Sequence, residues 1–271
     1  MNDRPQRFAV FGHPVAHSQS PRIHAEFARA TGQDLDYGLI EAPLDGFAQA
    51  VEGFRAAGGR GLNVTLPFKQ QAFALCTRVS ERARLAGVAN TLVLDQDLCD
   101  NTDGIGLVRD VSENLGFGLK NQSVLLLGAG GAAQGVIGAL LEAGAGRLVV
   151  ANRTVPKAAA LAERFAGISA SSYEALAGEA FDVVINATSA GLSDESPLIP
   201  PAVIHRKTLA YEMVYGRDTP FLAAARSAGA RVSDGLGMLV EQAAESFAFW
   251  RGVRPPSAQV LAELRALVDG K

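Results

Sequence analysis

The stretch from Ser123 to Thr154 constrains the fold of this chain more than any other part of the sequence. Its first residues, Val124–Leu127, form a short apolar run that is typical of a parallel strand buried on both faces. The run ends at a G-x-G-x-x-A pattern, Gly128–Ala133, and an Ala-rich segment with helical periodicity follows. A second apolar run, Arg147–Ala151, completes a β-turn-α-β unit, which indicates a Rossmann nucleotide-binding domain.

The small residues of the glycine pattern suit a bound pyrophosphate. Gly128 permits a tight turn after the strand, Gly130 lets the backbone approach a phosphate, and Ala133 keeps helix and strand close. The N–H groups at the start of the helix favour negative charge. The alternative is a Gly-rich connection that binds nothing, and the flanking strand, helix and strand argue against it. We therefore predict dinucleotide contacts at Gly128, Ala129, Gly130, Gly131 and Ala132.

The residues after the second strand favour NADP over NAD. An NAD site usually has an acidic residue about 20 residues beyond the glycines, where it binds the ribose 2′-hydroxyl. This chain has Asn152, Arg153 and Thr154 there, with Lys157 shortly after. A carboxylate would repel a 2′-phosphate, whereas a guanidinium binds one through two parallel hydrogen bonds. The alternative for Arg153 is a solvated surface arginine that has no ligand.

The composition is that of a globular protein large enough for two domains. Of the 271 residues, 48% are hydrophobic and 20% charged, and the net charge of −3 offers no basic surface for nucleic acid. The two cysteines lack metal-type spacing and suit a reducing compartment, and no apolar run is long enough to span a membrane. We expect a cytoplasmic protein with a small-molecule substrate and with no metal ion, nucleic acid or membrane partner.

Strands and helices alternate on both sides of the glycine pattern, which predicts an α/β fold with two domains. Before it, we expect strands at 7–12, 37–40, 61–66 and 89–94, and helices at 21–31, 45–57, 81–86 and 104–114, with another starting at 67–69. After it, we expect helices at 155–165 and 220–228 and strands at 181–188, 208–213 and 230–233. Two final helices, 239–250 and 257–268, have no strand between them.

These elements predict a division of the chain into two domains. Residues 1–107 with 239–271 are assigned to an N-terminal α/β substrate domain, and residues 108–238 to the Rossmann NADP-binding domain. The C-terminal helices are therefore expected to return to the first domain.

Small polar residues concentrate at the strand ends of the predicted first domain, where open α/β sheets bind ligands. They are Ser18, Ser20, Asn63, Thr65, Lys69, Asn90, Thr91, Asn101 and Asp103. Hydroxyls, amides, one lysine and one aspartate match a polyhydroxylated carboxylate better than an apolar or phosphorylated substrate. Structural alternatives exist for several of them: Ser20 as the cap of the first helix, Asn63 in a β-bulge, and residues 101–104 as an ordinary turn.

Eight motifs closely resemble the NADP-dependent shikimate dehydrogenase family, and they follow the family's order over nearly the whole chain. They are His17–Pro21, Asn63–Lys69, Gly87–Thr91, Asp100–Gly104, Gly128–Ala132, Asn152–Thr154, Ile185–Ser189 and Asp234–Leu239. The chain departs from the family at Ala133 and Lys157, where many members have serine and arginine. The resemblance implies reversible reduction of 3-dehydroshikimate to shikimate by NADPH, on the route to chorismate and the aromatic amino acids.

The resemblance also implies roles for individual residues. Lys69 and Asp103 match the catalytic pair, and Ser18 and Ser20 match hydroxyls that bind the substrate carboxylate. The other implied substrate contacts are Asn63, Thr65, Asn90, Asp103, Tyr215 and Gln242. The other implied cofactor contacts are Met213, Gly235 and Glu81.

A lysine beside an aspartate suits the reduction of a ketone. Hydride addition leaves negative charge on the oxygen, and the Lys69 ammonium can stabilise that charge and supply the proton. In the oxidation direction, the carboxylate of Asp103 favours the charged lysine, so the residue that removes the proton stays open.

Two rival functions remain beside this one. The first is a quinate/shikimate dehydrogenase, although such relatives often use NAD and carry an acid where this chain has Asn152 and Arg153. The second is a non-catalytic NADP-binding sensor, against which the presence of both Lys69 and Asp103 argues. We expect a monomer or a homodimer.

Overall fold

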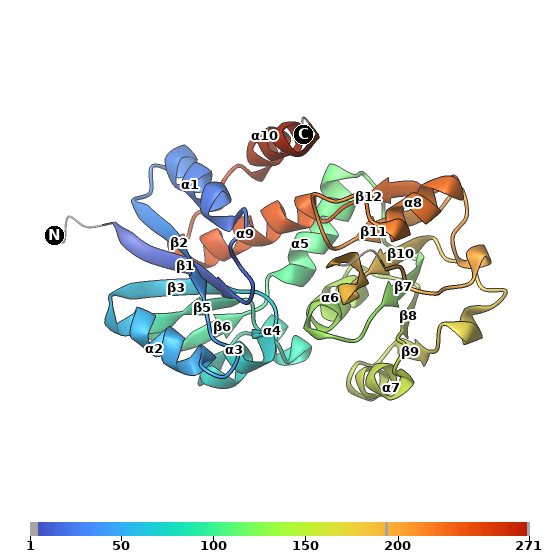
Figure 1. Ribbon diagram of the computed structural model, residues 1–271, viewed down its shortest axis with the longest axis horizontal. Coiled ribbons are helices and arrows are strands. Elements are labelled where there is room, and N and C mark those ends of the chain that lie inside the picture. The colour runs from blue at the N-terminus through green and yellow to red at the C-terminus, as the bar shows by residue number, and fades with distance from the viewer. Residues whose placement is uncertain (1–4, 193–194, 270–271) are drawn as a thin grey trace. The chain divides into compact units, whose positions relative to one another are not determined.

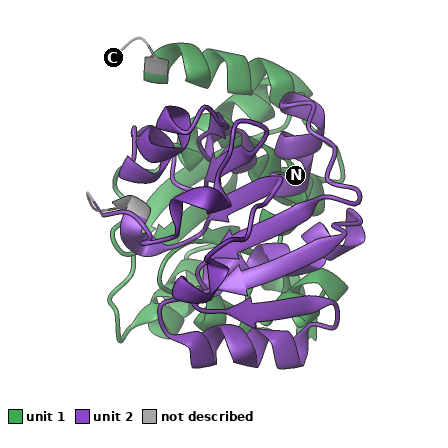
Figure 2. Ribbon diagram, turned by 90° about the vertical axis from the view of Figure 1, so that its right-hand side faces the viewer, with its two compact units in different colours: residues 1–106, 240–271 green, residues 107–239 purple. Residues whose placement is uncertain are grey.

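The computed structural model describes residues 5–192 and 195–269, and the chain divides into two compact units (Figures 1 and 2). Unit 1 comprises Met1–Gly106 with Val240–Lys271, and unit 2 comprises Leu107–Leu239. The chain passes into unit 2 within helix α5 (Asp103–Arg109) and returns within helix α9 (Leu236–Arg251).

Unit 1 is built on a six-stranded mixed sheet in the order β2-β1-β3-β5-β6-β4. Its strands are β1 (Gln6–Gly12), β2 (Leu35–Glu41), β3 (Gly59–Val64), β4 (Arg78–Val79), β5 (Thr91–Val93) and β6 (Leu98–Asp100). The first three run parallel, whereas β5 is antiparallel to both β3 and β6. Because β5 reverses direction, its first residue, Thr91, pairs with Asn63 near the end of β3 and with Asp100 at the end of β6.

The sequence predicts β5 but not the short strands β4 and β6. Each has only two or three residues, too few to show an alternating pattern. The antiparallel direction of β5 matters for the site. It brings the start of β5 to the edge of the sheet where β3 and β6 end.

The helices of unit 1 are α1 (Ser20–Thr31), α2 (Phe47–Ala56), α3 (Lys69–Leu75), α4 (Glu81–Ala86) and α10 (Ser257–Asp269), with most of α9. As predicted, α2 buries Phe47, Val51 and Phe54 on one face. The prediction that Ser20 caps α1 is wrong. The helix begins at Ser20 itself, and the capping position is Gln19, whose side chain makes no capping bond.

Unit 2 is built on a parallel sheet in the order β12-β11-β10-β7-β8-β9. Its strands are β7 (Ser123–Leu127), β8 (Arg147–Ala151), β9 (Ile168–Ser171), β10 (Val183–Asn186), β11 (Leu209–Glu212) and β12 (Arg231–Ser233). Counted within the unit, this is the order 6-5-4-1-2-3 of dinucleotide-binding folds, and the chain reverses its direction of winding between β7 and β10. The predicted α/β fold with a Rossmann domain is therefore confirmed.

Both faces of this sheet are buried, as the apolar runs predict. Successive residues of β7 alternate between two hydrophobic cores, with Val124 and Leu126 in one and Leu125 and Leu127 in the other. The covering helices are α6 (Gly131–Glu142), α7 (Val155–Arg164) and α8 (Pro220–Ser227). Unit 2 also has short 3₁₀ turns at Glu174–Leu176, Ser189–Leu192 and Pro201–Val203, and unit 1 has one at Leu94–Gln96.

The helix expected at 104–114 is not continuous. It ends as an α-helix at Arg109 and continues as a π-helical turn, Asp110–Asn114. The buried Asp110 accepts a hydrogen bond from the Tyr211 hydroxyl at 2.6 Å. A buried carboxylate needs such a partner, and a π turn is a known way to re-aim one residue of a helix.

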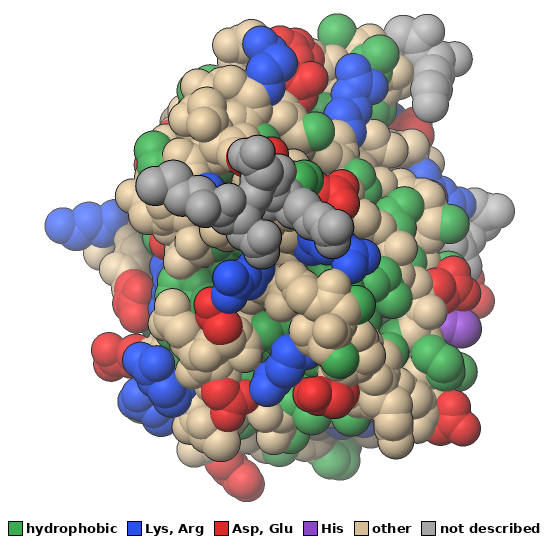
Figure 3. Space-filling model, turned by 90° about the vertical axis from the view of Figure 1, so that its left-hand side faces the viewer, with side chains coloured by type: hydrophobic (Ala, Val, Ile, Leu, Met, Phe, Trp, Pro, Cys, Tyr) green, Lys and Arg blue, Asp and Glu red, His purple; other side chains and the backbone are tan. Residues whose placement is uncertain are grey.

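Figure 3 shows the face at the left-hand end of Figure 1, where acidic and basic side chains are interspersed. Among the described residues, no helix combines the length and the apolar character needed to cross a membrane.

Candidate active site

Lys69 and Asp103 form the ion pair at the centre of the site. Lys69 is the first residue of α3 and Asp103 the first residue of α5. The Lys69 Nζ donates to Asp103 Oδ2 at 2.5 Å, and the two side chains are only 14% and 7% exposed. Charge-assisted hydrogen bonds of this kind are among the strongest in proteins, particularly away from water.

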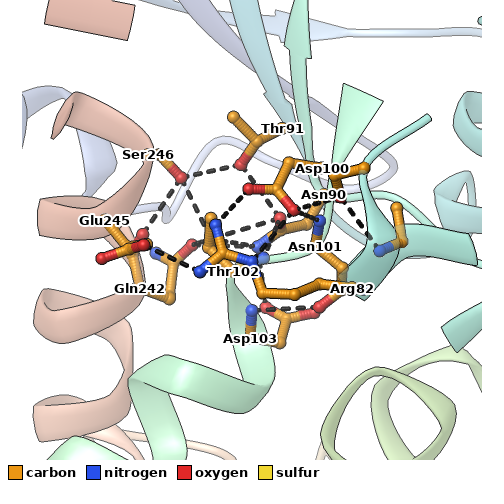
Figure 4. Close-up of polar contacts among 12 residues, drawn as sticks. Arg82, Asn90, Thr91, Asp100, Asn101, Thr102, Asp103, Gln242, Glu245 and Ser246 are labelled. Carbon is orange, nitrogen blue, oxygen red and sulfur yellow. Dashed lines mark hydrogen bonds and ion pairs between the residues drawn. The ribbon is translucent and has the colours of Figure 1, made fainter. Parts of the chain in front are cut away.

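Asn90 fixes the second oxygen of Asp103. Its Nδ2 donates to Asp103 Oδ1 at 2.9 Å and to Gln242 Oε1 at 3.2 Å (Figure 4). Its Oδ1 accepts from the backbone N–H of Thr102 at 2.9 Å. Because a backbone N–H can only donate, this bond determines which end of the Asn90 amide faces Asp103.

A second layer of polar side chains supports Asn90. Asn63 Nδ2 donates to the Asn90 carbonyl at 3.1 Å and to Ser246 Oγ at 3.0 Å. Ser246 Oγ lies 2.7 Å from Thr91 Oγ1 and 3.1 Å from Thr102 Oγ1. We call this set the polar cluster: Asn63, Lys69, Asn90, Thr91, Thr102, Asp103, Gln242 and Ser246. All its members but Lys69 are buried.

Tyr37 anchors the outer end of the polar cluster. Its hydroxyl donates to Asn63 Oδ1 at 2.7 Å, which leaves the Asn63 NH₂ group to face Asn90 and Ser246. Burial raises the pKa of Tyr37 well above its usual value, so the hydroxyl stays protonated and remains a donor. The ring of His24 stacks on that of Tyr37 with centroids 4.2 Å apart.

The regular pairing of Asn63 decides one of the alternatives left by the sequence. Asn63 pairs with Val10 on β1 and with Thr91 on β5, and the only register shift between β1 and β3 lies at Arg7 and Phe8. Asn63 is therefore not in a β-bulge. Its side chain is held by the cluster and not by an irregular backbone.

Ser18 and Ser20 lie together at the start of α1. Ser18 Oγ donates to Ser20 Oγ at 3.1 Å and accepts from the Ser20 backbone N–H at 3.2 Å. Ser18 is half-buried and Ser20 is buried. Thr65 is half-buried in the turn that joins β3 to α3, four residues before Lys69.

The glycine pattern forms the loop between β7 and α6, and we call residues 128–132 the glycine loop. Gly128 has φ +105°, and a Cβ there would lie 3.1 Å from the Ala187 carbonyl oxygen, so a side chain would be strained and crowded. Gly130 is the capping position of α6. Because glycine has no side chain, no side-chain oxygen at this position accepts from the N–H groups of the first turn. A Cβ on Gly130 would meet no atom of the described residues within 4 Å, so space among them is open beside the backbone.

The predicted 2′-phosphate residues follow β8. Asn152 Nδ2 donates to the Thr154 carbonyl at 2.9 Å, which fixes the turn into α7. Arg153 and Lys157 are exposed, and neither forms an ion pair with a carboxylate in the described part of the chain. Two such cations beside a backbone loop with open space fit the phosphates of NADP.

Of the remaining predicted residues, three lie in unit 2 and one in unit 1. Met213 and Tyr215 follow β11 and are half-buried. Gly235 is buried directly before α9, and a Cβ there would collide with the Met213 carbonyl oxygen. Glu81 is the first residue of α4 in unit 1, whereas the other predicted cofactor contacts lie in unit 2.

A separate hollow of about 800 Å³ lies at the amino-terminal end of β1 and β3. Its lining includes Arg7, Arg55, Arg60, Arg251, Asp34 and Asp95, and no member of the polar cluster. Ligands of open α/β sheets bind at the carboxyl ends of strands, so the hollow is not the candidate site.

Sequence reasoning did not single out Tyr37, Thr102 and Ser246. Helical spacing could have identified Ser246, because it lies four residues after Gln242 and therefore on the same face of α9. Thr102 lies between Asn101 and Asp103, which are both among the polar residues that the sequence indicates as candidates. Tyr37 lies in mid-strand and reaches Asn63 through the tertiary fold alone.

Comparison with known proteins gives consistent matches along the chain. Residues 10–92 match the shikimate dehydrogenase substrate binding domain, residues 110–200 the shikimate / quinate 5-dehydrogenase family, and residues 235–265 the shikimate 5'-dehydrogenase C-terminal domain. The chain is 58% identical to shikimate dehydrogenase (NADP(+)) of Aromatoleum aromaticum, over 97% of this chain and 98% of that protein.

Solved structures agree with these matches. The shikimate 5-dehydrogenase of Thermus thermophilus, in complex with NADP(H) and shikimate, aligns with a TM-score of 0.85 at 37% identity, covering 96% of this chain and 98% of that one. An Ael1 enzyme from Pseudomonas putida aligns with a TM-score of 0.90 at 51% identity, with the same coverage of 96% and 98%. The chain belongs to the shikimate dehydrogenase family.

Proposed function

We propose that the protein is an NADP-dependent oxidoreductase that reversibly reduces 3-dehydroshikimate to shikimate, on the route to chorismate and the aromatic amino acids. The observation that carries the proposal is the Lys69–Asp103 ion pair, 2.5 Å long and held within the polar cluster. It places a proton donor and a carboxylate together in a family whose relatives act on a hydroxyl of a polyhydroxylated carboxylate.

Lys69 is the residue we assign to proton transfer at the substrate oxygen. NADPH, when bound, supplies the hydride. In the reduction direction, the Lys69 ammonium hydrogen-bonds to the substrate carbonyl oxygen, stabilises its growing negative charge and donates the proton. One of its protons is directed to Asp103 Oδ2, which leaves two others to meet a ligand.

Asp103 orients Lys69, and Asn90 orients Asp103. Because Asp103 Oδ1 accepts from Asn90 while Oδ2 accepts from Lys69, the carboxylate cannot rotate without breaking one of the two bonds. In the oxidation direction, the Lys69–Asp103 pair as a whole takes the hydroxyl proton. Preorganised donors of this kind lower the barrier because they need no rearrangement in the transition state.

The substrate carboxylate is assigned to Ser18 and Ser20. The Ser18 hydroxyl donates to Ser20 Oγ at 3.1 Å, which holds the two hydroxyls together at the start of α1. The ring hydroxyls are assigned to Thr65, Asn90, Asp103, Tyr215 and Gln242. Asn63 completes the set by holding Asn90 in place, since both ends of its amide already bind protein atoms.

NADP is assigned to the glycine loop and to the residues after β8. The free N–H groups at the start of α6 and the open space beside Gly130 suit a pyrophosphate, and Arg153 and Lys157 suit a 2′-phosphate. Asn152 and Thr154 shape that turn, while Met213 and Gly235 are assigned to the lining of the cofactor site by resemblance to the family. Glu81 is assigned on the same resemblance alone.

The assignment of the two units follows from these residues. Unit 1 is the substrate domain and unit 2 the NADP-binding domain. We also propose a cytoplasmic location, which the two cysteines without a disulfide framework support. We further propose a monomeric or homodimeric state.

One assay tests the proposal. The purified protein is incubated with shikimate or quinate, each with NADP⁺ or NAD⁺, and the nicotinamide absorbance is followed. We expect the fastest turnover with shikimate and NADP⁺. Comparable turnover of quinate would support the quinate/shikimate alternative, and no turnover in any combination would exclude the enzyme function.

A further inference from the structure

Asp100 is a fully buried carboxylate three residues before the catalytic Asp103. Its Oδ1 accepts from Ser80 Oγ at 2.5 Å and from the backbone N–H of Asn101 at 2.7 Å. Arg82 donates to both oxygens, through Nε to Oδ1 at 3.1 Å and through Nη2 to Oδ2. A buried charge is tolerated only with such a set of partners. Arg82 supplies the opposite charge that stabilises the buried carboxylate of Asp100.

Arg82 also reaches the helix that carries Gln242. Its Nη1 donates to Glu245 Oε1 at 2.8 Å (Figure 4). Glu245 lies three residues after Gln242 on α9, and therefore on the same side of the helix. One guanidinium on α4 thus joins the end of β6 to α9.

Both ends of this bridge lead into the polar cluster. At the end of β6, Asp100 accepts from the Asn101 N–H, and the Asn101 side chain in turn accepts from the Asp103 N–H at 3.1 Å. On α9, Gln242 Oε1 accepts from Asn90, which holds Asp103. If the end of β6 moved relative to α9, the side chains of Asp103 and Gln242 would move apart. The substrate would then no longer meet both side chains in the geometry that the reaction requires.

We propose that Arg82 is a positioning residue for the reaction: by bridging Asp100 and Glu245, it sets the end of β6, and with it the start of α5 at Asp103, in register with the helix that carries Gln242. This inference rests on the proposed function. Arg82 contributes through those two residues, and its planar fork is suited to hold two carboxylates in fixed directions.

The competing explanation is an ion pair that stabilises unit 1 and does nothing else. Loss of stability reduces the amount of active enzyme and so the apparent kcat, but it leaves the KM of the molecules that remain folded unchanged. Mispositioning of Asp103 and Gln242 changes the KM for shikimate as well as kcat. The KM for shikimate therefore separates the two explanations.

The test measures kcat and KM for shikimate and for NADP⁺ in Arg82→Gln, Arg82→Lys and the wild type. For Arg82→Gln, we expect kcat/KM for shikimate to fall about tenfold with part of the loss in KM, as for one broken bond between charged groups. Arg82→Lys keeps the charge but lacks the fork, so it recovers part of the loss. The KM for NADP⁺ should stay within about twofold, because all of its assigned residues except Glu81 lie in unit 2.

Arg254→Gln is the matched control. Arg254 also pairs with Glu245, at 3.3 Å, and with Glu241, at 2.7 Å, but among the described residues it forms no ion pair with Asp100. Its kinetic constants should stay within about twofold of the wild type. If Arg82→Gln fails to fold, the double variant Arg82→Gln with Asp100→Asn removes the buried charge and should show the same rise in KM.

An unchanged KM for shikimate in the folded Arg82 variants would overturn the proposal, as would an equal rise in Arg254→Gln. Failure of the wild type to oxidise shikimate with NADP⁺ would instead contradict the proposed function, so the two failures are distinguishable.

Discussion

The polar cluster of unit 1 and the glycine loop of unit 2 are built in opposite ways. In the polar cluster, buried side chains fill the space and bind one another, and the Asn90 amide alone has partners on Thr91, Thr102, Asp103 and Gln242. At the glycine loop, small residues leave space open, and a Cβ on Gly130 would touch no atom of the described residues within 4 Å. The first region offers oriented functional groups, whereas the second offers backbone donors and room.

This difference determines how each region should respond to substitution. The polar cluster is sensitive to the loss of a functional group, because each group orients the next. The glycine loop is sensitive to the addition of atoms, because its function requires the backbone to approach a ligand. The predictions below test each half of this contrast, beginning with the largest expected effect.

Removal of the Lys69 ammonium should have the largest effect. We expect Lys69→Ala to reduce kcat about 10²–10⁴-fold, the usual range for a positioned acid or base. The KM for shikimate should change much less, because Ser18 and Ser20 remain. Steady-state kinetics on a variant shown to be folded and to bind NADPH provide the measurement. If kcat holds while KM rises, Lys69 only binds a hydroxyl.

Arg153→Ala should alter the choice of cofactor. The affinity for NADPH should fall about ten- to a hundredfold, the cost of one hydrogen bond between charged groups, and the affinity for NADH should be nearly unchanged. Titration of both cofactors, monitored by nicotinamide fluorescence, measures the ratio. An equal loss for both would show that Arg153 is a structural residue.

The stability of unit 1 should depend on pH through His24. Burial lowers the pKa of His24 to about 3, and the nearby Asn63 side chain opposes only a part of this shift. Between the unfolded value of 6.5 and this value, the unfolded chain binds more protons, so stability is lost as the pH falls below about 6.5. From pH 7 to pH 5, this one group removes about 2 kcal/mol of unfolding free energy.

His24→Phe provides the measurement. Trp250, the single tryptophan of the chain, lies on α9 in unit 1 and reports unfolding of that unit by its fluorescence. The variant should lose about 2 kcal/mol less than the wild type between pH 7 and pH 5. Equal losses would mean that His24 is already protonated in the folded protein or titrates equally in both states.

Gly130→Ala should have the smallest effect and should test the other half of the contrast. The added methyl group meets no atom of the described residues within 4 Å, so the unfolding free energy should fall by less than about 1 kcal/mol, the cost of Ala instead of Gly at a capping position. The affinity for NADP⁺ should fall about tenfold, because the methyl group occupies the space by which the backbone approaches the pyrophosphate. Gly138→Ala, on α6 and equally free of neighbours, is the control and should leave that affinity unchanged.

Much of the fold follows from sequence pattern. The predicted bounds of α4 and β8 agree with the structure, because Ser80 caps the first and the second is an uninterrupted apolar run. Strand β9, Ile168–Ser171, is not predicted, since it is short and half-exposed with alternate serines. The π turn at 110–114 begins at Asp110, whose side chain binds Tyr211, 101 residues away, and no local pattern predicts that contact.

In the candidate site too, local sequence pattern identifies some residues and misses those whose contacts depend on tertiary packing. Lys69, Asn90 and Asp103 lie at ends of elements that motifs identify, so their selection needs only the sequence. Their supports are Tyr37, Ser246 and Arg82, each of which lies in the interior of an element and reaches its partner only through tertiary packing. The reversal of β5 brings Asn90 beside Asp103, and it depends on the strand β6 that is too short to predict.

The central claim is that Lys69 and Asp103 act as one preorganised unit held by the polar cluster. A double-mutant cycle of Lys69→Ala and Asp103→Asn, with kcat for shikimate oxidation as the readout, tests it most directly. We predict that the double variant is little slower than the slower single variant, because residues that act together lose their function together. If the loss in the double variant instead equals the product of the two single losses, the residues act independently and the claim is wrong.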